Sequence, residues 1–150
     1  MNDRTIEQEI QSKGLTAPRV TPDAIHAEIV GEYFFTAADG YNASPCFDPT
    51  GQPGEALPAP LALGLLTFCV LQLRNGFTVT GESACASPEN FDVEIGRKIA
   101  RQNAVQKIWP LLGFRLRDDL VRSALTDADA EADLAGTSRP DDPRHSVANP

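Results

Sequence analysis

Apolar residues follow two spacings along this chain, and each spacing predicts a different kind of element. Residues 65–73 are almost all apolar, which is typical of a strand buried on both faces. Residues 77–85 alternate between apolar and polar side chains, as a half-buried strand does. Arg74-Asn75-Gly76 separates the two runs. Asn-Gly between strand-like runs favours a hairpin with a type I′ turn, in which both central residues have positive φ.

A long helical pattern follows the second strand. Ser87 can cap its start, with Pro88 at the first helical position and Glu89 in the first turn. We expect this helix to end at Trp109, because Pro110 disfavours helical backbone in the residue before it. A last, shorter helical stretch should follow. It carries three arginines beside an apolar side: Arg115, Arg117 and Arg122.

Two short helices are predicted before the hairpin. Thr5 can cap the first, and Lys13-Gly14 would end it. Thr21 can cap the second, which has a proline at its first position and an acid in its first turn. An apolar stripe predicts that this second helix continues to Asp39-Gly40. The stripe consists of Ile25, Ile29, Tyr33 and Phe34.

These elements predict an α+β fold, in which a β-hairpin or small antiparallel sheet packs on one long helix, with shorter N- and C-terminal helices. We expect residues 1–125 to form this single domain. Residues 39–60 mix prolines, glycines and small polar residues, so they should form a long loop without regular structure. Residues 126–150 contain almost no large apolar side chain and are expected to be a disordered tail.

The charge balance limits the partners. The net charge is −8, so acids outnumber the bases that would neutralise phosphates, and duplex nucleic acid is not an expected partner. A small anionic ligand can still bind an acidic protein where a local basic pocket exists. The longest apolar run, residues 61–71, is too short to span a bilayer, so no membrane partner is expected.

The cysteines and the N-terminus indicate a compartment. Cys46, Cys69 and Cys85 form no C-x-x-C pair, and their odd number argues against a disulfide scaffold. Residues 1–10 contain acids and no apolar run, so no signal peptide is visible. We therefore expect three free thiols in a reduced cytoplasm.

Signals for chemistry are weak. The segment Gly81-Glu82-Ser83-Ala84-Cys85 lacks the last glycine of a G-x-S-x-G nucleophile elbow, and no histidine stands in a triad position. Histidines and cysteines do not cluster with metal-ligand spacing. The sequence thus favours a binding protein over an enzyme and predicts no metal and no cofactor.

Polar residues share the predicted inward face of the long helix with apolar ones. Asp92 and Asn103 fall in the same arc as Ile95, Ala100 and Ala104 at about 100° per residue. In one interpretation, which base rates favour, the two polar side chains satisfy backbone groups of the preceding loop or the strands. In the other, Asn103 and neighbouring basic residues face a ligand cleft.

A long, spaced set of residues resembles a known family. The set comprises Asn75-Gly76-Phe77, Gly81, Ser83, Cys85, Pro88, Asn90-Phe91-Asp92, Ile95-Gly96, Ala100, Asn103-Ala104, Trp109-Pro110-Leu111 and Gly113, with Tyr33-Phe34-Phe35-Thr36-Ala37 and Asp39-Gly40 upstream. With it, the chain resembles a family of small tailed-phage accessory proteins, mostly uncharacterised proteins of phage and prophage genomes. The resemblance implies a phage origin and action in the cytoplasm of the infected bacterial host. It implies no particular chemistry.

The strand–hairpin–long-helix plan is also similar to that of the phage Thoeris anti-defence sponges. Those are small oligomeric proteins that sequester cyclic ADP-ribose-type or cyclic oligonucleotide immune signals without cleaving them. The resemblance implies a small nucleotide ligand and a homo-oligomer. None of their binding residues is carried over to this chain.

The leading functional hypothesis is therefore a non-enzymatic binder that sequesters a nucleotide signal and blocks anti-phage defence. Such a site needs an aromatic ring for the base, guanidinium groups for phosphates and polar groups for the ribose. The candidate ligand-binding residues are Phe91, Arg97, Arg101, Asn103 and Arg117. Two alternatives stay open: a protein-interaction module that binds a host or phage protein through the helix, and a phosphodiesterase-like enzyme. We expect a homodimer or higher homo-oligomer, with the ligand site between protomers.

Overall fold

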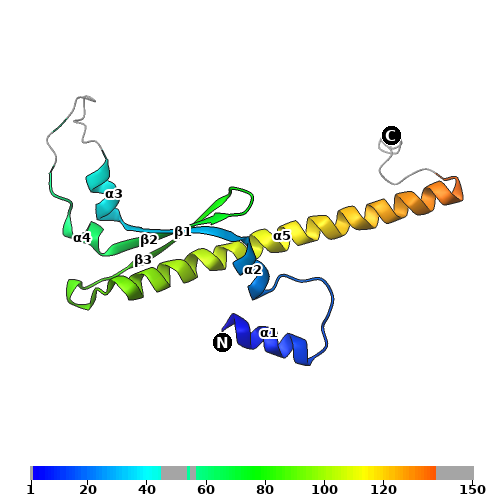
Figure 1. The fold of residues 1–150 in the computed structure, drawn as a ribbon, viewed down its shortest axis with the longest axis horizontal. Helices are drawn as coiled ribbons and strands as arrows, with labels where there is room; N and C mark the ends of the chain where they lie inside the picture. The colour runs from blue at the N-terminus through cyan, green and yellow to red at the C-terminus, as the bar shows by residue number, and fades with distance from the viewer. Residues whose placement is uncertain (1, 45–53, 55–56, 138–150) are drawn as a thin grey trace, which may run out of the picture.

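The computed structural model describes residues 2–44, 54 and 57–137, and a three-stranded antiparallel sheet on one long helix forms its centre (Figure 1). The strands are β1 (Ile29–Thr36), β2 (Leu66–Leu73) and β3 (Thr78–Ala84), in the order β1-β2-β3. The long helix, α5 (Val93–Ala135), crosses one face of the sheet and continues beyond it. The shorter helices are α1 (Asp3–Ser12), α2 (Pro22–Glu28), α3 (Ala37–Ala43), α4 (Leu61–Gly64) and a 3-10 helix (Pro88–Asn90). The predicted α+β class is confirmed.

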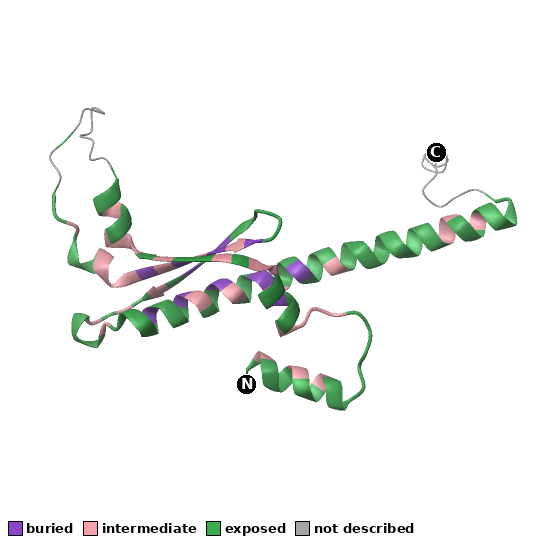
Figure 2. Ribbon diagram, viewed as in Figure 1, coloured by how far each residue is buried: buried purple, intermediate pink, exposed green. Residues whose placement is uncertain are grey.

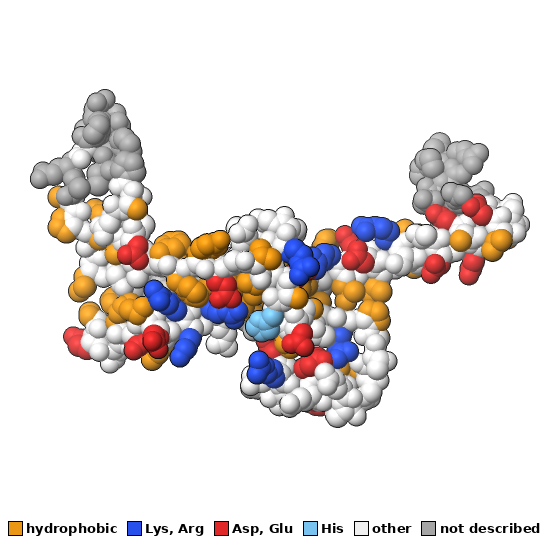
Figure 3. All heavy atoms as spheres, in the orientation of Figure 1, with side chains coloured by type: hydrophobic (Ala, Val, Ile, Leu, Met, Phe, Trp, Pro, Cys, Tyr) orange, Lys and Arg blue, Asp and Glu red, His pale blue; other side chains and the backbone are white. Residues whose placement is uncertain are grey.

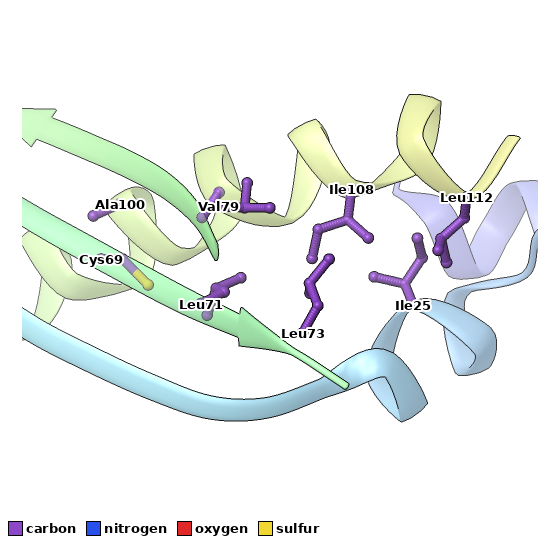
Figure 4. Close-up of a cluster of buried hydrophobic side chains, with 9 residues drawn as sticks. Ile25, Cys69, Leu71, Leu73, Val79, Ala100, Ile108 and Leu112 are labelled. Atoms are coloured by element: carbon purple, nitrogen blue, oxygen red, sulfur yellow. The ribbon is translucent and has the colours of Figure 1, made fainter. Parts of the chain in front are cut away.

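The core lies between the sheet and the first half of α5 (Figure 2). Every fourth residue of α5 is buried there: Gly96, Ala100, Ala104, Ile108 and Leu112. The row changes from small to large residues, so the helix lies close to the sheet at its start and leaves room for bulky side chains further on. Figure 4 shows Ile108 and Leu112 pointing toward Leu73 of β2 and Ile25 of α2.

The hairpin between β2 and β3 forms as predicted, but its turn is of another type. Gly76 has φ +86°, whereas Asn75 does not have positive φ. The Gly76 amide donates to the Leu73 carbonyl at 2.9 Å, and the Leu73 amide donates to the Phe77 carbonyl at 2.8 Å. This is a type I turn followed by a left-handed glycine. The Asn75 side chain, which accepts from the Phe77 amide at 3.0 Å, stabilises the turn and removes the need for positive φ at Asn75.

The predicted second helix stops earlier than its apolar stripe suggested. Thr21 caps α2 as expected, but the helix ends at Glu28, and the stripe residues after it belong to β1. Residues 29–36 are mostly β-branched or aromatic, and pairing with β2 overrides their helical spacing. The position at which we expected the helix to stop begins one instead, because Thr36 and Asp39 form a capping box for α3.

The long helix also differs from its predicted boundaries. It begins at Val93 with Asp92 as the N-cap, and Ser87 and Pro88 belong to the preceding 3-10 turn. It passes through Pro110 and ends at Ala135, so the predicted break at Trp109 and the separate C-terminal helix are both wrong. Packing of Ile108 and Leu112, on either side of the proline, holds the helix in register.

Two further predictions concern the C-terminal tail and the long loop, parts of which lie outside the described residues. Thr126–Ala135, which we expected to be disordered, is helical, and Gly136 ends the helix with φ +68°. The predicted long loop is partly taken up by α3, while residues 45–53 and 55–56, with Cys46, lie outside the described part of the chain. Cys69 and Cys85 are free thiols, as predicted. No helix within the described ranges is long and apolar enough to cross a membrane.

Candidate functional site

The five candidate ligand-binding residues do not surround one cleft. Arg97 and Arg101 interact with side chains of β1, whereas Asn103 binds β3. Phe91 lies before α5 and is half-buried. Arg117 is exposed on the outer part of α5, about 21 Å along the helix axis from Asn103 at a rise of 1.5 Å per residue. A single nucleotide cannot bridge all five in one protomer.

Arg101 is the most strongly held of the five. Its Nε lies 3.0 and 3.1 Å from the two carboxylate oxygens of Glu32, and its Nη2 lies 2.6 Å from Oε1. These hydrogen bonds lower the pKa of the Glu32 carboxyl and raise the pKa of Arg101. The pair therefore ties α5 to the edge strand β1. Arg97 lies over the ring of Phe34, with its guanidinium carbon 5.8 Å from the ring centroid.

Asn103 makes the contact that the backbone interpretation of this residue expects. Its Nδ2 donates to the main-chain carbonyl of Glu82 at 2.8 Å, and Lys107 forms an ion pair with the Glu82 carboxylate at 3.6 Å. Asp92 likewise serves the backbone, since its Oδ1 accepts from the Ile95 amide at 2.9 Å. The polar positions on this face thus join α5 to β3 and cap the helix.

Phe91 lines a small cavity of about 130 Å³ at the end of the hairpin. Ser83 and Cys85 line it as well, and the Cys85 thiol donates to the Ser87 carbonyl at 3.1 Å. Ser83 lies within β3 and not on a strand-to-helix turn, so the geometry of a nucleophile elbow is not formed. Within residues 2–44, 54 and 57–137, no group of three His, Cys, Asp or Glu side chains could hold a metal ion.

A wider hollow of about 690 Å³ lies between α1, α2 and α5, and Arg101 is part of its wall. We call it the basic hollow. Its charged lining residues are three cations and one acid: Arg4, Lys98, Arg101 and Asp3. The neutral lining residues are Asn2, Pro22, His26, Gln102, Val105 and Gln106. Figure 3 shows blue and red side chains together where α1 and α2 lie near α5, so acids also lie close to the hollow.

Sequence reasoning missed most of the basic hollow. Arg4 and Lys98 are 94 positions apart in the chain (98 − 4), and no local pattern indicates that they line the same hollow. The position of α1 is set by distant contacts: Arg19 binds Glu7 of α1, and Ile6 and Ile10 line a cavity together with Trp109 of α5. His26, which we expected to be a surface or half-buried residue, is exposed and lines the hollow.

The face of the sheet opposite α5 carries apolar side chains. We call it the open face, and it consists of Tyr33, Phe35, Leu66, Phe68 and Val70. Phe35 and Phe68 are cross-strand partners with ring centroids 5.6 Å apart, and Tyr33 is 55% exposed. Figure 1 shows α5 on the other side of the sheet and α3 and α4 at its end. Tyr33 and Phe35 are exposed on this face, whereas Leu66, Phe68 and Val70 are half-buried.

Comparison with known proteins identifies one family. The model of the family described as "Phage protein (N4 Gp49/phage Sf6 gene 66) family" matches residues 20–120. No curated protein and no solved structure matches the chain. The matched range contains α2, the whole sheet and the part of α5 that packs on it. It excludes α1 and the last turns of α5.

Proposed function

Because this chain belongs to the phage protein (N4 Gp49/phage Sf6 gene 66) family, we propose that it acts for a phage in its bacterial host by binding a small nucleotide in the basic hollow. One observation carries the proposal: three cations and one acid line this hollow in a chain whose net charge is −8, with Arg101 held in place by Glu32 of β1. Local positive charge on an acidic protein attracts a small phosphate-bearing ligand but not a long polyanion.

The size and the donors of the hollow fit that ligand class. Its volume of about 690 Å³ lies within the roughly 300–1,000 Å³ typical of small-molecule sites. The bonds from Arg101 to Glu32 use Nε and Nη2, which leaves Nη1 to donate to a phosphate oxygen while Glu32 fixes the guanidinium. Gln102 and Gln106 supply amides for ribose hydroxyls, and Pro22 and Val105 supply apolar contact for a base.

In the infected cell, the ligand would be a cyclic nucleotide immune signal of the cyclic ADP-ribose or cyclic oligonucleotide type. A protein that holds such a signal without converting it lowers its free concentration and so blocks the defence. The family match supports the phage origin, and the lining of the hollow supports the ligand class. Of the five residues proposed from sequence, Arg101 contributes to this site.

Retention of intact ligand tests the proposal. The purified protein is incubated with cyclic ADP-ribose-type and cyclic oligonucleotide ligands, separated from free ligand, denatured, and the released compound is identified. We expect intact release, and we expect Lys98→Ala and Arg4→Ala each to weaken binding by about ten-fold or more, because each removes a charge-assisted contact. Lys13→Ala is the matched control, since Lys13 is exposed and pairs with Glu9 outside the hollow. Release of an altered product would indicate an enzyme, and no retention would contradict nucleotide binding.

The open face favours a second candidate function, a module that binds a host or phage protein. Tyr33 and Phe35 expose large aromatic surface beside Phe68, and such surface is more typical of protein contacts than of a solvated sheet. Two variants separate the candidates: Tyr33→Lys disrupts the open face, and Lys98→Ala disrupts the hollow. If Tyr33→Lys abolishes the block of anti-phage defence in infected cells and Lys98→Ala does not, the interaction module is favoured. If Lys98→Ala abolishes this block and Tyr33→Lys does not, nucleotide binding is favoured.

A further inference from the structure

The outer segment of α5, residues 111–135, leaves the body of the protein. Leu112 is its last buried residue, and Figure 2 shows the helix beyond it almost entirely exposed. Several large apolar side chains there face solvent: Phe114, Leu120, Val121, Leu125 and Leu134. Phe114 is 72% exposed. Most helical stability in proteins comes from packing of an apolar face, and this face has no packing partner within the described residues of the protomer.

A heptad pattern runs along this outer segment. Seven positions are separated alternately by four and three residues, and six of them are apolar: Phe114, Asp118, Val121, Leu125, Ala128, Ala132 and Ala135. Leu111 extends the same pattern by one position toward the core. A repeat of 3.5 residues keeps these side chains on one face of a helix that supercoils around another helix. We call this face the seam.

Charge along the outer segment is divided between its two halves. The first half contains three arginines, Arg115, Arg117 and Arg122, and two acids, Asp118 and Asp119, and Arg115 is paired with Glu28 of α2. The second half, residues 127–133, contains four acids and no base. In a parallel pair, the four acids of the second half would lie beside their own copies, and Asp118 would face its own copy in the seam. An antiparallel pair instead places the arginines of one helix near the acids of the second half of the other.

We propose that the outer segment pairs antiparallel with the same segment of a second copy of this chain, about a twofold axis near Ser123. In this register Val121 packs against the partner's Leu125, and Phe114 packs against the partner's Ala132, so large residues meet small ones. Arg117 lies opposite the partner's Glu131. Arg122, which comes near its own copy at the axis, is paired with Asp119 of its own helix at 3.3 Å.

The length of the outer segment suits this arrangement. The partner's Ala135 lies opposite Leu111, at the point where α5 enters its own core. The two helices therefore overlap over about 35 Å at 1.5 Å per residue, and each end of the overlap lies beside the hairpin and α2 of one body. The family match ends at residue 120, so most of the seam lies outside the matched range. The twofold contact leaves Asn103 and the basic hollow on each body, away from the seam.

Sedimentation equilibrium of the full-length protein over a range of concentrations tests the pairing. We expect a mass of twice 16.2 kDa for the wild type and a monomer for the Val121→Glu/Leu125→Glu variant. A dimer of this variant would bring the two introduced glutamates of each protomer together in the seam, where like charges repel. Leu134→Glu is the control: Leu134 is 90% exposed and off the seam, so this variant should remain a dimer. Circular dichroism checks that the body remains folded. A monomeric wild type, or a dimeric double variant, would overturn the proposal.

A charge exchange tests the direction of the helices. Arg117→Glu and Glu131→Arg should each raise the dimer dissociation constant several-fold, because each places like charges opposite one another twice per dimer. The double variant Arg117→Glu/Glu131→Arg should restore the wild-type constant if the helices are antiparallel. If the double variant does not restore the wild-type dissociation constant, the antiparallel register is wrong.

Discussion

Gly81 of β3 lies against the backbone of α5 at Ala100, so closely that a Cβ atom at position 81 would be 2.1 Å from the Ala100 carbonyl oxygen. The same Cβ would be 2.3 Å from the amide nitrogen of Ala104. Both neighbours are backbone atoms, which cannot rotate away. The small residues of the buried row on α5 and the glycine of β3 therefore bring the helix and the edge strand into direct contact, and the Asn103 bond to Glu82 follows from this approach.

We expect Gly81→Ala to lower the free energy of unfolding by about 3 kcal/mol, at the upper end of the range for overpacking. The added methyl group would push α5 away from β3 and strain the contacts on both sides. Urea denaturation measures the loss. Gly113→Ala is the matched control, because nothing lies within 4 Å of its Cβ position and alanine favours the helix by up to about 1 kcal/mol. Equal stability of Gly81→Ala and the wild type would contradict the contact.

Asn103→Ala should lower the free energy of unfolding by about 1 kcal/mol and leave nucleotide retention unchanged. The side chain is exposed, so water can replace its amide at the Glu82 carbonyl, which keeps the loss small. Denaturation and ligand retention are measured on the same preparation. A variant that keeps its stability but loses the ligand would place Asn103 in a binding site after all.

Acid should weaken the fold through Glu32. The pKa of its carboxyl is lowered from 4.5 because it accepts hydrogen bonds from Arg101. A carboxyl whose pKa is lower in the folded than in the unfolded protein stabilises the fold above its unfolded-state pKa, and this contribution is lost as the pH falls toward the folded-state pKa. We therefore expect Tm to fall below about pH 4.5, and less steeply in Glu32→Gln.

Thermal melts in steps from pH 7 to pH 3 check this dependence. Glu94→Gln is the control, because within the described ranges Glu94 forms no ion pair. The pKa of Glu28 is also lowered, by its hydrogen bond to Arg115. The double variant Glu28→Gln/Glu32→Gln should therefore lose even less Tm at low pH than Glu32→Gln does. If Tm falls equally with pH in the wild type and the double variant, neither ion pair contributes to the pH dependence of stability.

Pro110→Ala should stabilise the protein by about 2 kcal/mol, because it restores a main-chain donor and removes the ring from the interior of α5. Part of the gain is offset by the greater freedom of alanine in the unfolded chain. Urea denaturation of the variant measures the change. Pro22→Ala should act in the opposite direction, by about 0.4–1 kcal/mol, since Pro22 occupies the first position of α2, where its fixed φ is favourable. A loss of stability in Pro110→Ala would mean that the helix is adapted to the proline.

The sequence by itself determined the features that depend on neighbours in the chain. The hairpin follows from Arg74-Asn75-Gly76, and the start of α2 follows from Thr21 and Pro22, because turns and caps are formed by side chains within a few residues of the backbone they bind. The alternation of buried residues in β3 and the apolar run of β2 were enough to place both strands and to give the α+β class.

The tertiary structure decided what depends on distant partners. The spacing of Ile25, Ile29 and Tyr33 fits a helix, yet residues 29–36 form a strand because β2 offers them a free edge. Pro110 remains helical because Ile108 and Leu112 are held by the sheet and α2. Arg101 was selected from sequence, but its partner Glu32 is 69 residues away. A contact at that distance is fixed by the packing of whole elements, and local pattern carries no information about it.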